Sequence, residues 1–490
     1  MPFSMKLARF ARRALLCSAI LVTLLALAFL VENWRGDRAW REHEEALQAM
    51  PPLLQAFPAP SRIPDAQNFM RTPTLEKFLF APTESVEMKA CLKQLPLNAS
   101  NIWIWVKGKR FDFSSFAAAQ VPAAKQNPAP LPSAPKASAA EVLSLLDPAE
   151  PILNELRGAL AERPLSEIKR PVPINPLAPF SAPITRFQFV RGINLALISH
   201  ACASLSLGQN AVGLEDTLAA LRFCRGFLDT PDVLLIEAMI GTSLMTMNLQ
   251  PVWEGTRLHL WNEAQLGRLQ SELSKVHALR SLGRSMEAER LGALLTMEHV
   301  TASTLLLRPS EIGLETRFHW SDLLVVPHGW VQQNKVGTSQ AMQHHIDLLR
   351  AAGTSSFLSK RADCDRFEKS LESSSNFNPY RVLTLMALPA FRKVTQSATA
   401  ADARVSLALS ACALERYHLA KGGYPESLSA LVPDYLPAVP LDPINGQPLR
   451  YHSLPGGTYK LYSLGLNGTD EAGTSDPDLD KGDWTWPELN

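Results

Sequence analysis

The chain has 490 residues, more than a single hydrophobic core usually holds, so two or three folding units are expected. Its hydrophobic content of 46% and charged content of 19% are typical of globular proteins and exclude a chain that is disordered throughout. The formal net charge of +1 creates no long-range field, which argues against nucleic-acid binding.

The chain begins with the pattern of a membrane anchor. Four cations precede an apolar run at 14–31: Lys6, Arg9, Arg12 and Arg13. The run is long enough to cross a hydrocarbon core as a helix, and the cations in front of it place the N-terminus in the cytoplasm. We therefore expect a single-pass protein of the inner (cytoplasmic) membrane. Segment 1–34 would be its cytoplasmic tip and transmembrane signal anchor, and its bulk would be periplasmic or otherwise extracytoplasmic.

A cleaved signal peptide is the alternative, because Ala26-Leu27-Ala28 has the small residues of a cleavage site. The apolar run continues beyond it through Phe29-Leu30-Val31. Trp34 then stands where an aromatic residue would lie at the membrane surface. Both features favour the anchor.

Segment 35–116 is expected to form a juxtamembrane stalk, helical and charged at 35–48, followed by a small mixed α+β subdomain. Residues 101–106 are β-branched and aromatic, which predicts a strand. Segment 117–140 is rich in Ala, Pro, Ser and Lys and predicts a flexible linker.

Segment 141–378 is predicted to be a helical domain. Helices are expected at 186–208, 211–228, 278–299 and 342–352. Thr230 is expected to cap another helix, with Pro231 at its first position, and Asn262 with Gln265 forms the capping-box start of one more. Short loops between consecutive helices imply antiparallel packing, in either a helical bundle or an irregular α-solenoid.

The six cysteines do not form a disulfide framework. Cys17 lies in the membrane segment, which leaves an odd number of widely spaced cysteines outside it. No CxxC pair occurs, so neither a zinc knuckle nor a thioredoxin-like site is indicated. We expect most of these cysteines to be small buried hydrophobic residues.

Segment 379–490 is predicted to be a small α+β module. A helix reaches Lys421 after a kink at Pro389, and Gly422-Gly423 end it. Strands are predicted at 449–453, 458–463 and 483–486. The first two form a hairpin around Pro455-Gly456-Gly457. A long helix on a small antiparallel sheet is an α+β unit.

An ordered series of short motifs follows this helix over about ninety residues. Its members are Tyr417, Tyr424-Pro425, the Leu428 and Leu431 pair, Pro440, Asp442 and Pro443, the Gly-x-Pro-x-x-Tyr at Gly446, and Tyr462-Ser463-Leu464-Gly465. The series resembles the C-terminal module of the major (G-type) pseudopilins of type II secretion systems. The whole architecture looks like large bacterial envelope proteins in which such a module ends an otherwise unassigned chain.

The N-terminus departs from the pseudopilin pattern. That family carries a Gly-Phe-type prepilin-peptidase site before its membrane helix, with a Glu at the fifth mature position, and residues 1–15 show neither. The membrane segment is also separated from the module by the helical domain. We therefore expect that this protein is not processed and polymerised as a pseudopilin.

The acidic stretch after the hairpin is the candidate metal site. Its polar residues are Asn467, Asp470, Glu471, Asp476, Asp478, Asp480 and Asp483, and the carbonyl near Leu464 could add a ligand. Oxygen ligands on a flexible loop suit calcium. The resemblance implies calcium at Asn467 (Asp in the family), Asp478, Asp480 and the Gly-x-Trp ending at Trp484. The predicted ligands are therefore Leu464, Asn467, Asp476, Asp478, Asp480 and Asp483. The alternative is a solvated acidic turn.

Other chemical motifs are weaker. His344 and His345 are adjacent, so they face different directions on a helix and cannot chelate together as an i, i+4 pair would. Ser166-x-x-Lys169 matches a nucleophile motif only in part, without partner motifs. No P-loop, GxSxG, HExxH or dinucleotide fingerprint occurs.

Two functions remain at this stage. The first is a non-enzymatic, membrane-anchored extracytoplasmic interaction or scaffold protein with a protein partner in the envelope, associated with a type II secretion or pilus-like apparatus. The second is an extracytoplasmic enzyme, such as a hydrolase, with a site assembled from residues distant in sequence. A cavity lined by converging titratable side chains would favour the second.

Overall fold

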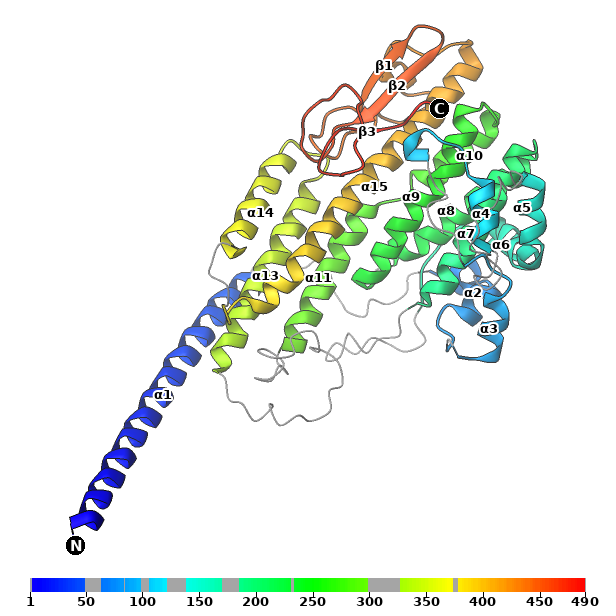
Figure 1. Ribbon diagram of the computed structural model, residues 1–490. Helices are drawn as coiled ribbons and strands as arrows, with labels where there is room; N and C mark the ends of the chain where they lie inside the picture. Colours follow the sequence, from blue (N-terminus) through cyan, green and yellow to red (C-terminus); the bar gives the residue numbers. More distant parts are fainter. Residues whose placement is uncertain are drawn as a thin grey trace, which may run out of the picture.

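The computed structural model describes residues 2–48, 63–82, 84–97, 105–120, 138–169, 185–230, 233–297, 327–372 and 378–489. Within these ranges the chain is mainly helical, with one small antiparallel sheet near the C-terminus (Figure 1). The prediction of a mainly α protein is confirmed.

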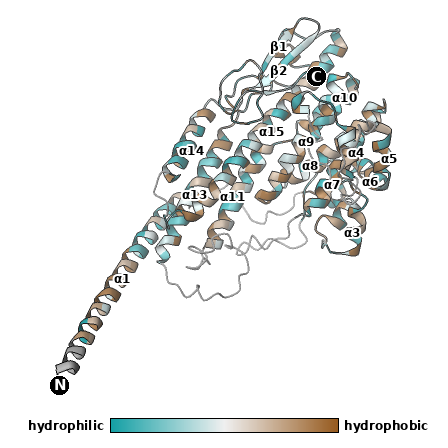
Figure 2. Cartoon of the chain, in the orientation of Figure 1, coloured by the Kyte–Doolittle hydropathy of each residue, from teal (hydrophilic) through white to brown (hydrophobic). Residues whose placement is uncertain are grey.

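Helix α1 (Pro2–Gln48) runs without a break through the predicted membrane segment and the predicted stalk. It is long and apolar enough to cross a membrane, and none of its most apolar stretch is buried. Figure 2 shows this apolar stretch projecting from the rest of the molecule. By length and composition it fits a membrane anchor, and a signal sequence would have the same character. Beyond it, α1 packs against α13 (His328–Ala351).

Short helices follow α1 in the described chain. They are α2 (Pro73–Phe78), α3 (Val86–Leu92), α4 (Phe113–Gln120), α5 (Ala139–Leu146) and α6 (Glu150–Glu162). The predicted linker at 117–140 is helical at both described ends, because residues 117–120 belong to α4 and α5 begins at Ala139. Its residues 121–137 lie outside the described residues.

The strand predicted at 101–106 is wrong where the structure describes it. Trp105 begins the 3-10 helix Trp105–Lys107. Its backbone N–H donates to Oε1 of Gln250 at 2.8 Å, and its ring packs on that of Trp486 with 5.3 Å between centroids. These distant contacts, rather than a neighbouring strand, fix the segment. Residues 101–104 lie outside the described residues.

Three long helices form the next part of the core: α7 (Phe187–Ser206), α8 (Asn210–Asp229) and α9 (Leu235–Arg257). The first two confirm the helices predicted at 186–208 and 211–228. The prediction that Thr230 caps the third is wrong. Thr230 follows the end of α8, where its hydroxyl donates to the carbonyl of Gly226 at 2.5 Å and accepts from the N–H of Ile168 at 2.8 Å. Helix α9 begins at Leu235 instead.

Four further helices complete the described body. They are α10 (Glu263–Leu273), α11 (Ala278–Met297), α14 (Phe357–Glu372) and α15 (Val382–Lys421). The capping box of Asn262 and Gln265 at the start of α10 is confirmed. Helix α15 continues through Pro389 and contacts α9, α10, α11, α13 and α14. The helices therefore cluster around α15, whereas the helices of a solenoid contact mainly their neighbours in the chain.

The sheet consists of β1 (Arg450–Leu454), β2 (Thr458–Ser463) and β3 (Trp484–Thr485), antiparallel in the order β1-β2-β3. The predicted hairpin and third strand are confirmed. Tyr459 and Leu461 of β2 share one core with the C-terminal half of α15 and with helices of the body. Helix α15 thus belongs both to the helical cluster and to the sheet that packs on it.

The cysteines behave as predicted. All six are free, Cys17 is exposed on α1, and the other five are buried.

Candidate functional site

The predicted calcium ligands occupy one loop, but they point in different directions. Asp476 accepts from the N–H of Asp478, and Asp478 accepts from the N–H of Asp480, so these carboxylates stabilise successive turns. Asn467 accepts from the N–H of Thr469 at 3.0 Å. Asp476 and Asp478 are exposed.

Leu464 and Asp483 lie inside the module. The carbonyl of Leu464 accepts from the hydroxyl of Ser463 at 3.0 Å. Asp483 is 1% exposed, and its Oδ2 accepts from the N–H groups of Glu471 and Gly473 at 3.0 and 2.7 Å. Its Oδ1 is buried without a hydrogen-bond partner among the described residues. Burial, together with the nearby carboxylate of Glu471, raises the pKa of Asp483 to about 6.

Asp480 points away from the loop, towards the helices. Its Oδ1 accepts from Arg361 of α14 at 2.7 Å, and its Oδ2 accepts from Gln396 of α15 at 2.8 Å. Both oxygens of this predicted ligand are therefore engaged. The calcium site stays a prediction, with Asp483 as the one ligand whose buried oxygen still needs a partner.

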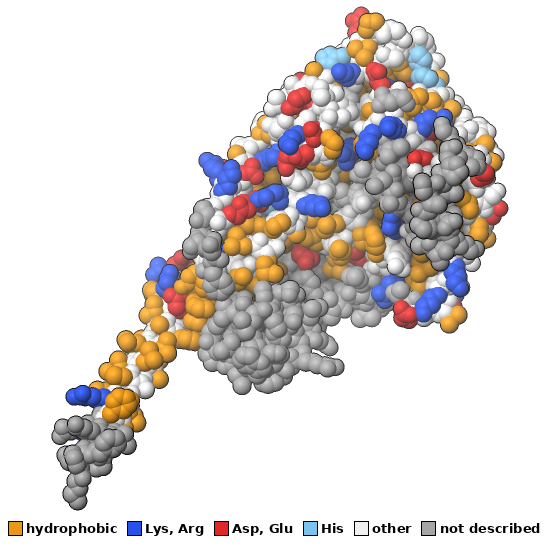
Figure 3. All heavy atoms as spheres, in the orientation of Figure 1, with side chains coloured by type: hydrophobic (Ala, Val, Ile, Leu, Met, Phe, Trp, Pro, Cys, Tyr) orange, Lys and Arg blue, Asp and Glu red, His pale blue; other side chains and the backbone are white. Residues whose placement is uncertain are grey.

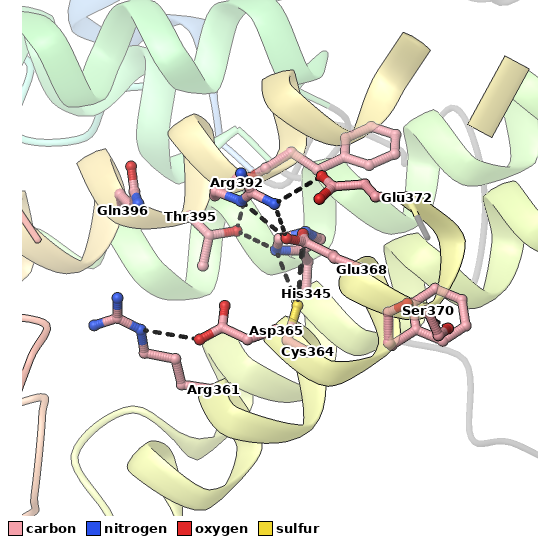
Figure 4. A network of polar contacts seen from close by, with 12 residues as sticks. His345, Arg361, Cys364, Asp365, Glu368, Ser370, Glu372, Arg392, Thr395 and Gln396 are labelled. Atoms are coloured by element: carbon pink, nitrogen blue, oxygen red, sulfur yellow. Dashed lines mark hydrogen bonds and ion pairs between the residues drawn. The ribbon is translucent and has the colours of Figure 1, made fainter. Parts of the chain in front are cut away.

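A cavity of about 320 Å³ lies behind Asp480, between α13, α14 and α15. Figure 4 shows its polar side chains, which converge from the three helices. Arg361 and Asp480 line it together with Arg392 and with a buried group at its base, His345, Cys364 and Glu368.

The buried group consists of one residue from α13 and two from α14. His345, Cys364 and Glu368 are 2%, 3% and 2% exposed. His345 Nε2 lies 3.0 Å from Glu368 Oε1, and Cys364 Sγ lies 3.8 Å from Nε2 and 3.9 Å from Oε1. In the part of the chain that the structure describes, no other three His, Cys, Asp or Glu side chains are close enough to hold one ion.

Two residues of α15 support this group from the other side. Arg392 donates to Oε2 of Glu368 through Nε at 2.9 Å and through Nη2. Thr395 Oγ1 lies 3.1 Å from Nδ1 of His345 and donates its own proton to the carbonyl of Phe391 at 3.0 Å. Thr395 is therefore an acceptor for an N–H at Nδ1.

The electrostatics follow from these contacts. Burial alone would raise the pKa of Glu368, but its hydrogen bonds to His345 and Arg392 outweigh burial and the pKa is lowered. Burial raises the pKa of the Cys364 thiol to about 12, and the Glu368 carboxylate adds to the effect. The thiol is thus protonated, and it is not an activated nucleophile in this state.

The sequence indicated only part of this arrangement. His344 and His345 do face different partners: the ring of His344 lies 4.4 Å from that of Phe367, whereas His345 faces the cavity group. The prediction that these two histidines form no site together therefore missed the role of His345 in the cavity group. Cys364 and Glu368 are four residues apart on a helix, a spacing that could have been noticed, but nothing local joins them to α13.

The partial nucleophile motif at Ser166 and Lys169 does not form a site. Ser166 is 1% exposed, and Lys169 pairs with Asp65.

Comparison with protein-family models, with curated proteins and with solved structures finds no match to this chain.

Proposed function

We propose that this protein is a single-pass, membrane-anchored interaction or scaffold protein. Its N-terminus would be cytoplasmic and its body would lie in the periplasm or an equivalent extracytoplasmic space. One observation carries the proposal: α1 continues without a break from its exposed apolar stretch into a packed interface with α13. The interface lies beyond Ala28 and would survive cleavage there, so the choice of an anchor rests on the apolar run that continues past Ala28 to Val31 and into this interface.

The first support is the surface of α1. Figure 3 shows hydrophobic side chains along the projecting part of the helix, and charged side chains where it reaches the body. Large apolar residues such as Leu21, Leu25 and Leu30 are 59%, 52% and 65% exposed. Apolar surface of this extent needs lipid or a partner to cover it. The basic residues before the apolar run set the orientation.

The second support is the fit between α1 and α13. An ideal Cβ at Gly36 would lie within 2.7 Å of three backbone atoms of Gly329, so the two helices cross where neither has a side chain. Small residues at such a crossing let helix backbones approach closely. The N–H of Gly329 donates to Oδ1 of Asn33 at 3.0 Å, and Lys335 Nζ lies 3.8 Å from the ring centroid of Trp40.

The interface continues to the end of α1. His43 lies near Arg290 of α11, and burial together with that charge lowers the pKa of the imidazole. The contact with α13 already includes Glu32 and Asn33, the two residues that directly follow the end of the apolar run at Val31. The body would therefore sit directly on the membrane surface, without a free stalk.

The third support is the place of the C-terminal module. Helix α15 has 40 residues, so it is about 60 Å long, and the sheet packs on its C-terminal half. Figure 1 shows the sheet at the opposite end of the molecule from the N-terminus of α1. The module would thus face the extracytoplasmic space, where its pseudopilin-like pattern suits a partner of a type II secretion or pilus-like apparatus.

Calcium is part of the same proposal. The loop from Asn467 to Asp483 would take the ion through its exposed carboxylates and the free Oδ1 of Asp483. Bound calcium stabilises the folded state by mass action. A rise in the thermal midpoint with calcium but not with magnesium, lost in Asp478→Asn, would support this part. An unchanged midpoint in the wild type would contradict it.

The second candidate, an extracytoplasmic enzyme, is favoured by the cavity with its converging His345, Cys364 and Glu368. The protonated state of the thiol does not favour a thiol hydrolase, so the interaction role remains the main proposal.

Topology is the decisive experiment for the anchor. Reporter fusions at the N-terminus and after residue 489 should show activity of a periplasm-dependent reporter only at the C-terminal end. The full-length chain should stay in the membrane after an alkaline carbonate wash. A cytosolic C-terminus, or a soluble chain shortened by about 28 residues as cleavage after Ala28 would give, would overturn the proposal.

A further inference from the structure

Two adjacent helices bring three metal-ligand types to one point. Cys364 and Glu368 are one turn apart on α14, so their side chains share one face. That face packs on α13, where His345 projects towards them. Ligands on facing helices are a common way to build a metal site inside a helical bundle.

The distances between the donor atoms suit one small ion. In a tetrahedral zinc site, bonds of about 2.0 Å to N and O and about 2.3 Å to S separate N and O by roughly 3.3 Å and S from either by roughly 3.5 Å. Here the N–O separation is 3.0 Å and the separations from sulfur are 3.8 and 3.9 Å. Each pair is thus within about 0.4 Å of the geometry that an ion requires.

We propose that His345, Cys364 and Glu368 bind a divalent transition metal ion of the zinc type, with the fourth coordination position directed to the cavity. A thiolate and an imidazole select such ions over calcium and magnesium, which prefer oxygen. Three protein ligands with one open position are the pattern of a zinc site that binds a water or a substrate.

The surrounding side chains already hold two ligands in suitable states. Arg392 occupies Oε2 of Glu368 and leaves Oε1 facing the imidazole and the thiol. Thr395 accepts from Nδ1 of His345, which makes Nε2 the ligand nitrogen. Partners of this kind orient metal ligands and fix the histidine tautomer.

Metal binding is coupled to proton release. Zinc-type ions bind a thiolate and an unprotonated ring nitrogen, so any proton on Cys364 Sγ or His345 Nε2 is released to solvent as the ion enters.

One side-chain movement accompanies binding. Sγ of Cys364 is almost equally far from the two ring nitrogens of His345, 3.9 and 3.8 Å, so it does not lie in the direction of the Nε2 lone pair. The imidazole or the thiol must turn for both to face one ion. The cavity beside them provides room for the turn and the route for entry.

Cobalt(II) provides the test, because thiolate ligation gives it a charge-transfer absorption in the near ultraviolet. The full-length chain in detergent is stripped with a chelator, titrated with cobalt(II) in weak buffer, and then challenged with zinc(II). We expect one equivalent of cobalt to bind with a thiolate band, with release of protons, and the band to be lost when zinc is added.

Matched variants decide whether this group is responsible. Cys364→Ser should abolish the thiolate band, and His345→Gln should weaken cobalt binding by more than about 10-fold. The controls His344→Gln and Cys91→Ser, which alter the neighbouring histidine and another buried cysteine, should bind like the wild type. If His345→Gln does not fold, Cys364→Ser decides alone, because serine fits the space of the thiol. No thiolate band in the wild type, or an unchanged band in Cys364→Ser, would overturn the proposal.

Discussion

The crossing of α1 and α13 makes a sharp prediction at Gly36. A methyl group there would meet the backbone of Gly329 within 2.7 Å, whereas ordinary contact begins at 3.4 Å. The atoms that it meets are backbone, so no flexible side chain can turn away. Gly36→Ala must therefore push the two helices apart.

The magnitude follows from the interactions that the methyl group disturbs. Overpacking of this kind costs about 1–3 kcal/mol. Separation also weakens the Asn33 hydrogen bond and the cation–π interaction between Lys335 and Trp40, about 1 kcal/mol each. The better helix propensity of alanine offsets about 1 kcal/mol. The net loss of docking free energy is about 2–4 kcal/mol, so the state in which α1 has left α13 should become roughly 30- to 800-fold more populated.

Hydrogen–deuterium exchange of the detergent-solubilised full chain measures this loss. Once undocked, residues 37–48 form an isolated end of helix that is marginally stable in water. Their amides should exchange roughly 30- to 800-fold faster in Gly36→Ala, while those of α7 and α8 stay unchanged. Gly267→Ala on α10 is the matched control, because a methyl group there meets no atom within 4 Å. Unchanged exchange at 37–48 in Gly36→Ala would refute the packed crossing.

Three further predictions test the body and the module. Thr230→Val should lower stability by about 1–3 kcal/mol in thermal unfolding, because the N–H of Ile168 loses its buried acceptor, and Thr230→Ser should restore most of it. Asp480→Asn should leave overall stability nearly unchanged but speed the alkylation of Cys364, measured by mass spectrometry, because an ion pair at the cavity mouth is removed. The carboxyl of Asp483 has a folded pKa of about 6 against a reference value of 3.8. Protonation therefore favours the folded state, and the urea midpoint of the wild type should rise relative to Asp483→Asn as the pH falls from about 7 to about 5. Parallel pH profiles would contradict the buried titration.

What could be predicted from the sequence was local. The capping box of Asn262 and Gln265 and the hairpin at 449–463 depend on residues a few positions apart, and both are present. Thr230 was assigned to the wrong helix because its hydroxyl serves α8 and the distant Ile168 instead. The packing of neighbours from elsewhere in the chain overrides local preference at such positions.

The two sites of greatest interest required the fold. Gly36 and Gly329 are ordinary glycines in the sequence, and only the crossing of α1 and α13 shows why neither position tolerates a side chain. Likewise, His345 is 19 residues from Cys364, and the antiparallel packing of α13 and α14 brings them together. No sequence motif predicts this contact, because the number of residues between His345 and Cys364 depends on the length of the loop that joins α13 to α14.

Asp480 connects the calcium prediction with the cavity. Its two oxygens hold Arg361 and Gln396 at the cavity mouth, and both would have to be released, at least in part, for Asp480 to serve as a calcium ligand. If the loop takes calcium as its resemblance implies, calcium bound through Asp480 would weaken the contacts of Asp480 with Arg361 and Gln396, and these contacts would weaken calcium binding to the same extent.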